Sequence, residues 1–145
     1  MKKKQNNQDR KYLPTLADLI DSLTINQIKE IKFRDKKSAY EKEIKEICHD
    51  IDLVIEEKQI KFSSKFIRII VIIAQLNLYI WENKDKMQEG KEENYLQLLK
   101  LAHQLNGIRN TMKNELSEEF GEKNPSKKRT NIEADDLKGW EINLD

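Results

Sequence analysis

Glycine and proline are scarce in this chain: four Gly and two Pro stand among 145 residues. Average usage of the two together is about 12%, roughly three times as much. Folds that depend on many tight turns, on a repeated collagen-like glycine or on flexible glycine linkers are therefore excluded. The scarcity predicts long helices with few connections, and it leaves little glycine for loops that cradle phosphate groups.

Four segments have the apolar period of amphipathic helices, and each is preceded by a residue that typically starts a helix or followed by one that typically stops it. The clearest runs from Tyr40 to Val54, where apolar residues step by 4, 3, 4 and 3. Thr15, Ser38 and Ser63 are the predicted N-caps, and Gly121 is the predicted stop. We therefore expect helices over 15–32, 38–58, 63–88 and 94–120, packed antiparallel as one all-α bundle.

The most apolar segment leaves a choice between helix and strand at residues 66–73, because FIRIIVII also has strand propensity. Helix is favoured, since residues 65–89 hold no Gly or Pro and no second strand candidate exists to pair with it. Being apolar nearly all round, this helix is predicted to be the buried centre of the bundle. Its apolar run contains Arg68, Gln75 and Asn77 and is shorter than the roughly 20 residues of a membrane span.

Charge is balanced overall and uneven along the chain. With 27 basic and 26 acidic residues the net charge is +1, so no overall field attracts nucleic acid or an anionic membrane, and neither is an expected partner. We expect a basic tail over 1–11, the bundle over 12–121, and a loop with a C-terminal arm over 122–145. A single cysteine, Cys48, rules out an intrachain disulfide and fits the cytoplasm. With 37% hydrophobic residues the monomer core is modest, which predicts a homo-oligomer.

A polar row on the fourth helix is the strongest candidate for a ligand site. Its members fall within about 80° of one another, on the side away from that helix's apolar stripe. Amide, imidazole and amine groups of this kind can hold a phosphate or a nucleobase. An ordinary solvated face or a polar subunit contact is the alternative. The row consists of His103, Asn106, Asn110 and Lys113. With Arg109 at its edge, and with Gln75 and Tyr79 of the third helix behind it, the row gives a predicted ligand-binding set of seven residues.

Two further features suggest other functions. Glu43 with Glu46, and Glu82 with Asp85, are similar to the paired E-x-x-acid motifs with which all-α nucleotide pyrophosphatases of the MazG type hold magnesium. That similarity implies a magnesium-dependent pyrophosphatase as a runner-up; no cofactor is expected otherwise. Trp140, in an acidic C-terminal stretch, is a candidate anchor that either folds back on its own bundle or clasps another subunit.

Three short segments resemble a small protein family of the large tailed bacteriophages, the myoviruses: LADLIDSLTINQIKE at 16–30, QLNLYIWEN at 75–83 and AHQLNGIRNTMKN at 102–114. The resemblance implies a viral protein acting in the host cytoplasm and brings no catalytic residue with it. By analogy with small phage proteins that sequester nucleotide messengers of bacterial immunity, we expect a binding protein that captures a small anionic, nucleotide-like ligand. The alternative from another class is a protein–protein interaction module or inhibitor of a host protein.

Overall fold

The computed structural model describes residues 13–90, 92–122 and 138–145, and within them the chain is all-helical. Four α-helices follow one another: α1 (Leu16–Lys32), α2 (Lys37–Lys58), α3 (Ser64–Gln88) and α4 (Glu92–Glu119), with a single 3-10 turn, η1 (Arg34–Lys36), between the first two. This confirms the predicted all-α bundle, and residues 66–73 are helix. The predicted tail over 1–11 and the basic runs Lys2–Lys4 and Lys127–Arg129 lie outside the described residues.

The predicted helix ends are confirmed where a capping side chain or a glycine determines them. Thr15 forms a complete capping box with Asp18, and the Ser63 hydroxyl accepts the Phe66 backbone N–H. Gly121 adopts φ +63°, the left-handed conformation that lets the chain leave α4. Ser38, however, is not a cap. The η1 turn runs directly into α2, so the backbone is already helical before Ser38.

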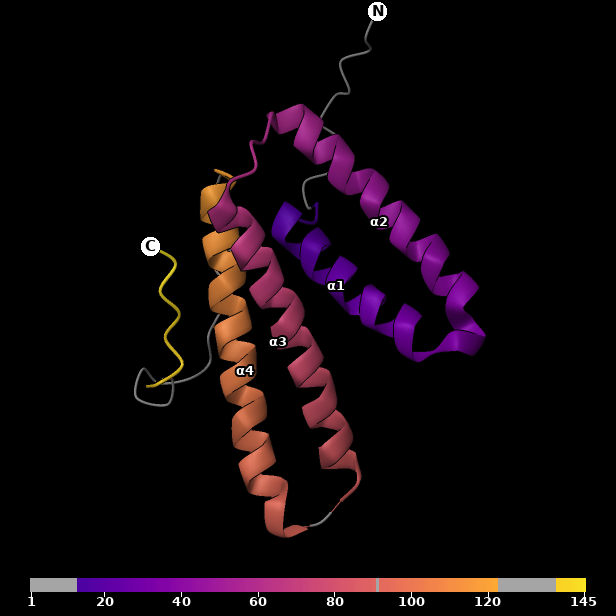
Figure 1. Ribbon diagram of the computed structural model, residues 1–145, viewed down its shortest axis with the longest axis vertical. Helices are drawn as coiled ribbons and strands as arrows, with labels where there is room; N and C mark the ends of the chain where they lie inside the picture. The colour runs from indigo at the N-terminus through magenta and orange to yellow at the C-terminus, as the bar shows by residue number, and fades with distance from the viewer. Residues whose placement is uncertain (1–12, 91, 123–137) are drawn as a thin grey trace, which may run out of the picture.

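The helices form two antiparallel pairs, α1 with α2 and α3 with α4 (Figure 1). α1 packs on all three other helices, whereas among the described helices α2 packs on α1 alone. No residue of α2 is fully buried. The core lies where α1, α3 and α4 meet, around the fully buried side chains Leu16, Ile69, Ile73, Leu105 and Leu116.

This arrangement corrects the prediction that the third helix is the buried centre. α1 is the helix that packs on all three others, and α3, although it supplies more buried residues than α1, has a second apolar stripe that faces water. Because α2 rests on α1 rather than on α3, nothing in the described residues covers Ile67, Val71 and Leu78, which are 56%, 47% and 40% exposed.

By length and composition α3 is the one described helix that could cross a membrane, a test that core helices of soluble proteins also pass. Its polar residues argue for packing within this fold. Asn77 and Asn83 are buried and hydrogen-bond to neighbouring helices, and Glu82 and Asp85 are exposed near its end. The structure is therefore compatible with a soluble protein.

Residues 140–145 lie along the α3–α4 pair, on the side away from α1 (Figure 1). We call this segment the arm. Its apolar residues Trp140, Ile142 and Leu144 pack against the core, and Glu141, Asn143 and Asp145 are exposed. Trp140 thus takes the first of its two predicted places in this structure, on its own bundle.

Candidate functional site

The predicted polar row does not lie on one solvent-facing surface. Lys113 is buried, Asn106 and Asn110 are half-buried, and His103 is exposed. The row divides because α1 covers one edge of it. The wheel of a single helix gives the angle between side chains but not the direction in which the next helix lies.

Arg109 and Lys113 enter a polar cluster between α1, α3 and α4. The Lys113 ammonium lies 3.0 Å from a carboxylate oxygen of Asp18 and 3.3 Å from one of Asp21, both on α1. These are close ion pairs, and the side chains of Lys113 and Asp21 are only 11% and 13% exposed. The positive charge of Lys113 is therefore balanced by α1 within the fold.

Asn77 of α3 connects the same cluster from the opposite side. Its Nδ2 donates to Asp21 Oδ1 at 2.8 Å and to Thr24 Oγ1 at 2.7 Å, and its Oδ1 accepts from Arg109 Nη1 at 3.1 Å. The amide thus bonds to two helices at once, as a buried amide must if it is not to lose hydrogen-bond energy. Arg109 of α4 is thus one partner of Asn77, and α1 supplies the others.

Sequence reasoning missed the α1 members of this cluster. Asp18, Asp21 and Thr24 recur at every third residue, so they share one side of the helix, and that spacing was the available signal. The Thr24 hydroxyl also donates to the Asp21 carbonyl at 2.8 Å, and α1 continues unbroken past it.

Gln75 and Tyr79 lie apart from the row. Both are exposed, and together with Ile108 and Trp140 they line a hollow of about 340 Å³ beside the arm. Ile108 is two residues from both Asn106 and Asn110, which places it about 200° away around α4. The seven predicted ligand residues are thus distributed over two surfaces. Capture of a nucleotide-like ligand stays a prediction. Substituting His103 and Asn106 and measuring ligand binding tests it directly, because these two side chains are not in the ion pairs of Lys113.

The carboxylates of the pyrophosphatase alternative are on different helices that do not touch. Glu43 and Glu46 are exposed on α2, and Glu82 and Asp85 are exposed on α3. Among the described residues no three His, Cys, Asp or Glu side chains gather as a metal site would require.

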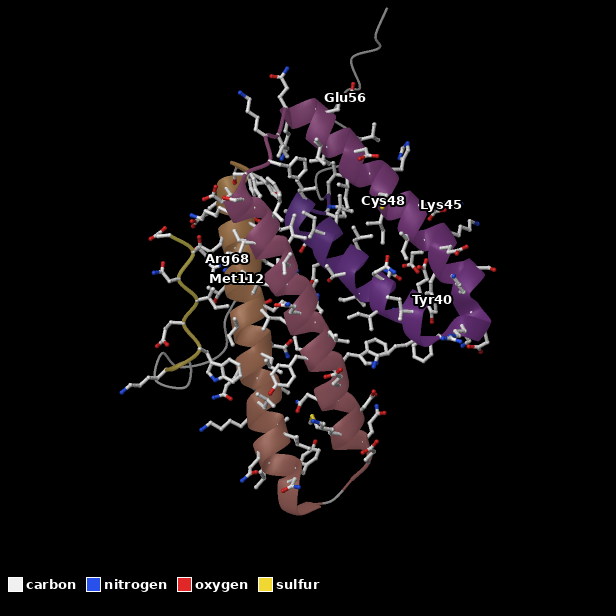
Figure 2. All side chains as sticks on the ribbon, in the orientation of Figure 1. Tyr40, Lys45, Cys48, Glu56, Arg68 and Met112 are labelled. Atoms are coloured by element: carbon white, nitrogen blue, oxygen red, sulfur yellow. The ribbon has the colours of Figure 1, made fainter. Side chains whose placement is uncertain are left out.

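A site that the sequence did not reveal adjoins this cluster farther along α1, and Thr24 lines both. An open groove of about 560 Å³ runs between α1, α2 and α3, and its lining is almost wholly apolar. The side chains that form it include Leu23, Ile28, Ile31, Ile44, Cys48 and Leu78. Figure 2 shows Cys48 in the middle of α2, along this groove.

Aromatic side chains connect the corner between α1 and α2 to α3. Phe33 packs edge-on against Trp81 of α3, with ring centroids 5.9 Å apart, and it also contacts Tyr40 at 6.3 Å. The exposed stripe of α3 continues the groove: Ala74 and Leu78 line it, and Ile67 and Val71 extend it at a spacing of 4 and 3 residues. That spacing was visible in the sequence and was assigned to the core.

Two ionisable groups near the ends of α4 have shifted pKa values. Burial raises the pKa of the Glu122 carboxyl, against the opposing effects of Lys58 and of the Ala17 and Leu16 backbone N–H groups. The hydrogen bond to Glu119, at 2.9 Å, raises the pKa of the Lys65 ammonium. Neither group lies in the polar cluster or in the apolar groove.

Comparison with known proteins gives no family: no family model matches this chain, and no curated protein or solved structure matches it.

Proposed function

We propose that this protein is a protein–protein interaction module that self-associates through the groove between α1, α2 and α3. The observation that carries the proposal is the groove itself, which is open and apolar and is continued by the exposed α3 stripe, in a chain whose charged fraction is 37%. Contiguous apolar surface of this kind typically marks a binding interface, because leaving it in water costs free energy.

The exposed stripe of α3 supports a second copy as the occupant. A groove between helices binds the apolar face of another helix through residues spaced by three and four positions. Ile67, Val71, Ala74 and Leu78 have that spacing and lie beside the groove. A two-fold related copy would therefore place each stripe in the groove of the other, and both surfaces would be covered at once.

Charge supports one orientation of that pair. Residues 34–45 hold five basic and three acidic residues, and residues 46–57 hold five acidic and no basic ones. The exposed α3 stripe ends beside Glu82 and Asp85. If the second copy's α3 runs opposite to α2, these acids lie near the basic half of α2, where Lys37 and Lys45 are exposed. The reverse orientation would bring acids to the acidic half.

The test is sedimentation velocity of the wild-type chain and two variants across a wide range of concentration. Leu78→Glu places a charge in the groove, and Leu96→Glu is the matched control, because Leu96 is 76% exposed on α4 and does not line the groove. We expect the wild type and Leu96→Glu to form dimers at concentrations at which Leu78→Glu is monomeric, with equal helical circular dichroism for all three. A wild type that stays monomeric, or a control that dissociates equally, contradicts the proposal.

A further inference from the structure

The arm shows what a second surface of the bundle can bind. Along residues 140–145 apolar and polar side chains alternate, and the three apolar ones face the helices. This is the alternation of an extended peptide that lies on a surface with one edge in contact and the other in water. The surface beneath it is formed by α3 and α4, on the side that faces away from the self-association groove.

The contacts of the arm are of a kind that another peptide could reproduce. Arg68 of α3 donates from Nη1 to the backbone carbonyl of Asn143, a contact that depends on the peptide backbone and not on the Asn143 side chain. Trp140 and Ile142 lie over Leu76 and Ile108 of the two helices. Figure 2 shows Arg68 and Met112 on this side of the helix pair.

The arm is held loosely. Trp140, Ile142 and Leu144 are each only half-buried, and two hollows of about 380 Å³ and 340 Å³ remain along the arm. Segments with few buried contacts open at a small fraction of the global unfolding free energy. The arm can therefore leave its groove while the bundle stays folded.

Charges of both signs lie beside the arm, so its recognition rests on the backbone contact to Arg68 and on the apolar side chains. The basic groups at the Asn143–Asp145 end of the arm are Arg68 and Lys65, and Asp145 is one of the charges that favour the ammonium form of Lys65. Acids of α4 are present too, since Glu115 lines the same hollow and Glu119 pairs with Lys65. The arm places Asp145 at the basic edge and leaves Glu141 exposed.

We propose that the α3–α4 groove beneath residues 140–145 is a binding site for an extended segment of a partner protein, in which one aromatic and two aliphatic side chains alternate with polar ones. The chain's own arm occupies the site as a displaceable ligand. The partner's segment makes the Arg68 contact through its backbone and seats its apolar side chains in the two hollows. This site is separate from the self-association groove and does not depend on it.

The experiment measures binding of a fluorescent peptide with the sequence of residues 138–145 to the full-length chain. In a Trp140→Ala, Leu144→Ala variant the arm loses two of its three anchors, so the peptide should bind at least tenfold more tightly than it binds the wild type. Adding Arg68→Ala to that variant should abolish most of the gain, whereas Arg34→Ala, on the exposed η1 turn, should not. Equal peptide affinity for the wild type and the arm variant overturns the proposal.

A second measurement needs no substitution in the protein. Excess peptide carrying phenylalanine in place of Trp140 should displace the arm of the wild-type chain and shift tryptophan emission to longer wavelength. Emission that does not change at the highest peptide concentration overturns the proposal. So does sedimentation that shows the wild-type arm bridging two copies, with dimers lost in Trp140→Ala but kept in Leu78→Glu, because the site then serves a second copy.

Discussion

Two adjoining sides of α1, which share Thr24, differ in character: toward α3 and α4 the side chains are polar and largely closed to water, and toward α2 and α3 they are mostly apolar and open to it. Toward α3 and α4, Asp21 meets Lys113 and Asn77 in a cluster of ion pairs and hydrogen bonds. Toward α2 and α3, Leu23 and Ile28 line the open groove. Residue type alone would assign these two sides the opposite roles, the polar one to a ligand and the apolar one to the core.

The difference teaches that pairing, and not polarity, decides what a surface can still bind. Lys113 and Arg109 have hydrogen-bonding or ionic partners within the fold, so a ligand would have to displace those partners. The groove has no such partners among the described residues, and its apolar area is still available for burial. The predictions below separate the two sides, from the largest expected effect to the smallest.

Removing the buried amine should have the largest effect. Lys113→Ala removes the ammonium that pairs with Asp18 and Asp21, and breaking a buried ion pair in this way costs about 3 kcal/mol. Urea unfolding measures the loss. Lys100→Ala, at an exposed position of the same helix, is the control and should change the free energy of unfolding by less than about 0.5 kcal/mol. Equal effects of the two substitutions would show that the cluster is not a unit of the fold.

Removing the amide that joins three helices should cost somewhat less. Asn77→Ala leaves Arg109 Nη1 without its Asn77 acceptor, beside an Nε that is already buried without a partner, and we expect a loss of about 2 kcal/mol. A double-mutant cycle with Arg109→Ala should show that the two losses are not additive. Additive losses would mean that the two side chains act independently.

The groove should behave in the opposite way. Because Leu78 is 40% exposed, Leu78→Glu should change the free energy of unfolding of the monomer by less than about 0.5 kcal/mol, although we expect it to abolish the proposed self-association. Urea unfolding at a concentration where the wild type is also monomeric gives the comparison. A loss as large as that of Lys113→Ala would place Leu78 in the core and remove the distinction between the two sides.

The smallest effect concerns pH. Because burial raises the pKa of Glu122 in the folded state, folded chains hold its proton more tightly than unfolded ones. The contribution of Glu122 to stability is therefore present below its ordinary pKa of 4.5 and is lost as the pH rises through the raised value. Glu122→Gln should remove this decline from the stability curve. A decline that persists unchanged in Glu122→Gln would assign it to another group.

Much of the fold follows from local sequence, because caps and turn residues act on their immediate neighbours. Thr15 and Ser63 start their helices through their own hydroxyl groups, and Gly121 ends α4 through its own backbone angle. No such local signal states which helix packs on which. The burial of Lys113 depends on where α1 lies, and the exposure of Leu78 depends on α2 packing on α1 and not on α3. The predicted ligand residues do not come together on one surface because the packing of the helices could not be predicted from local sequence.

The most direct test of the account is the reactivity of Cys48, the only cysteine of the chain, which lines the groove. Alkylation by N-ethylmaleimide should slow as the concentration of wild-type protein rises, because a second copy covers the groove. It should stay fast at every concentration in Leu78→Glu. A wild-type rate that does not depend on concentration would show that the groove stays open to water, and would contradict the account.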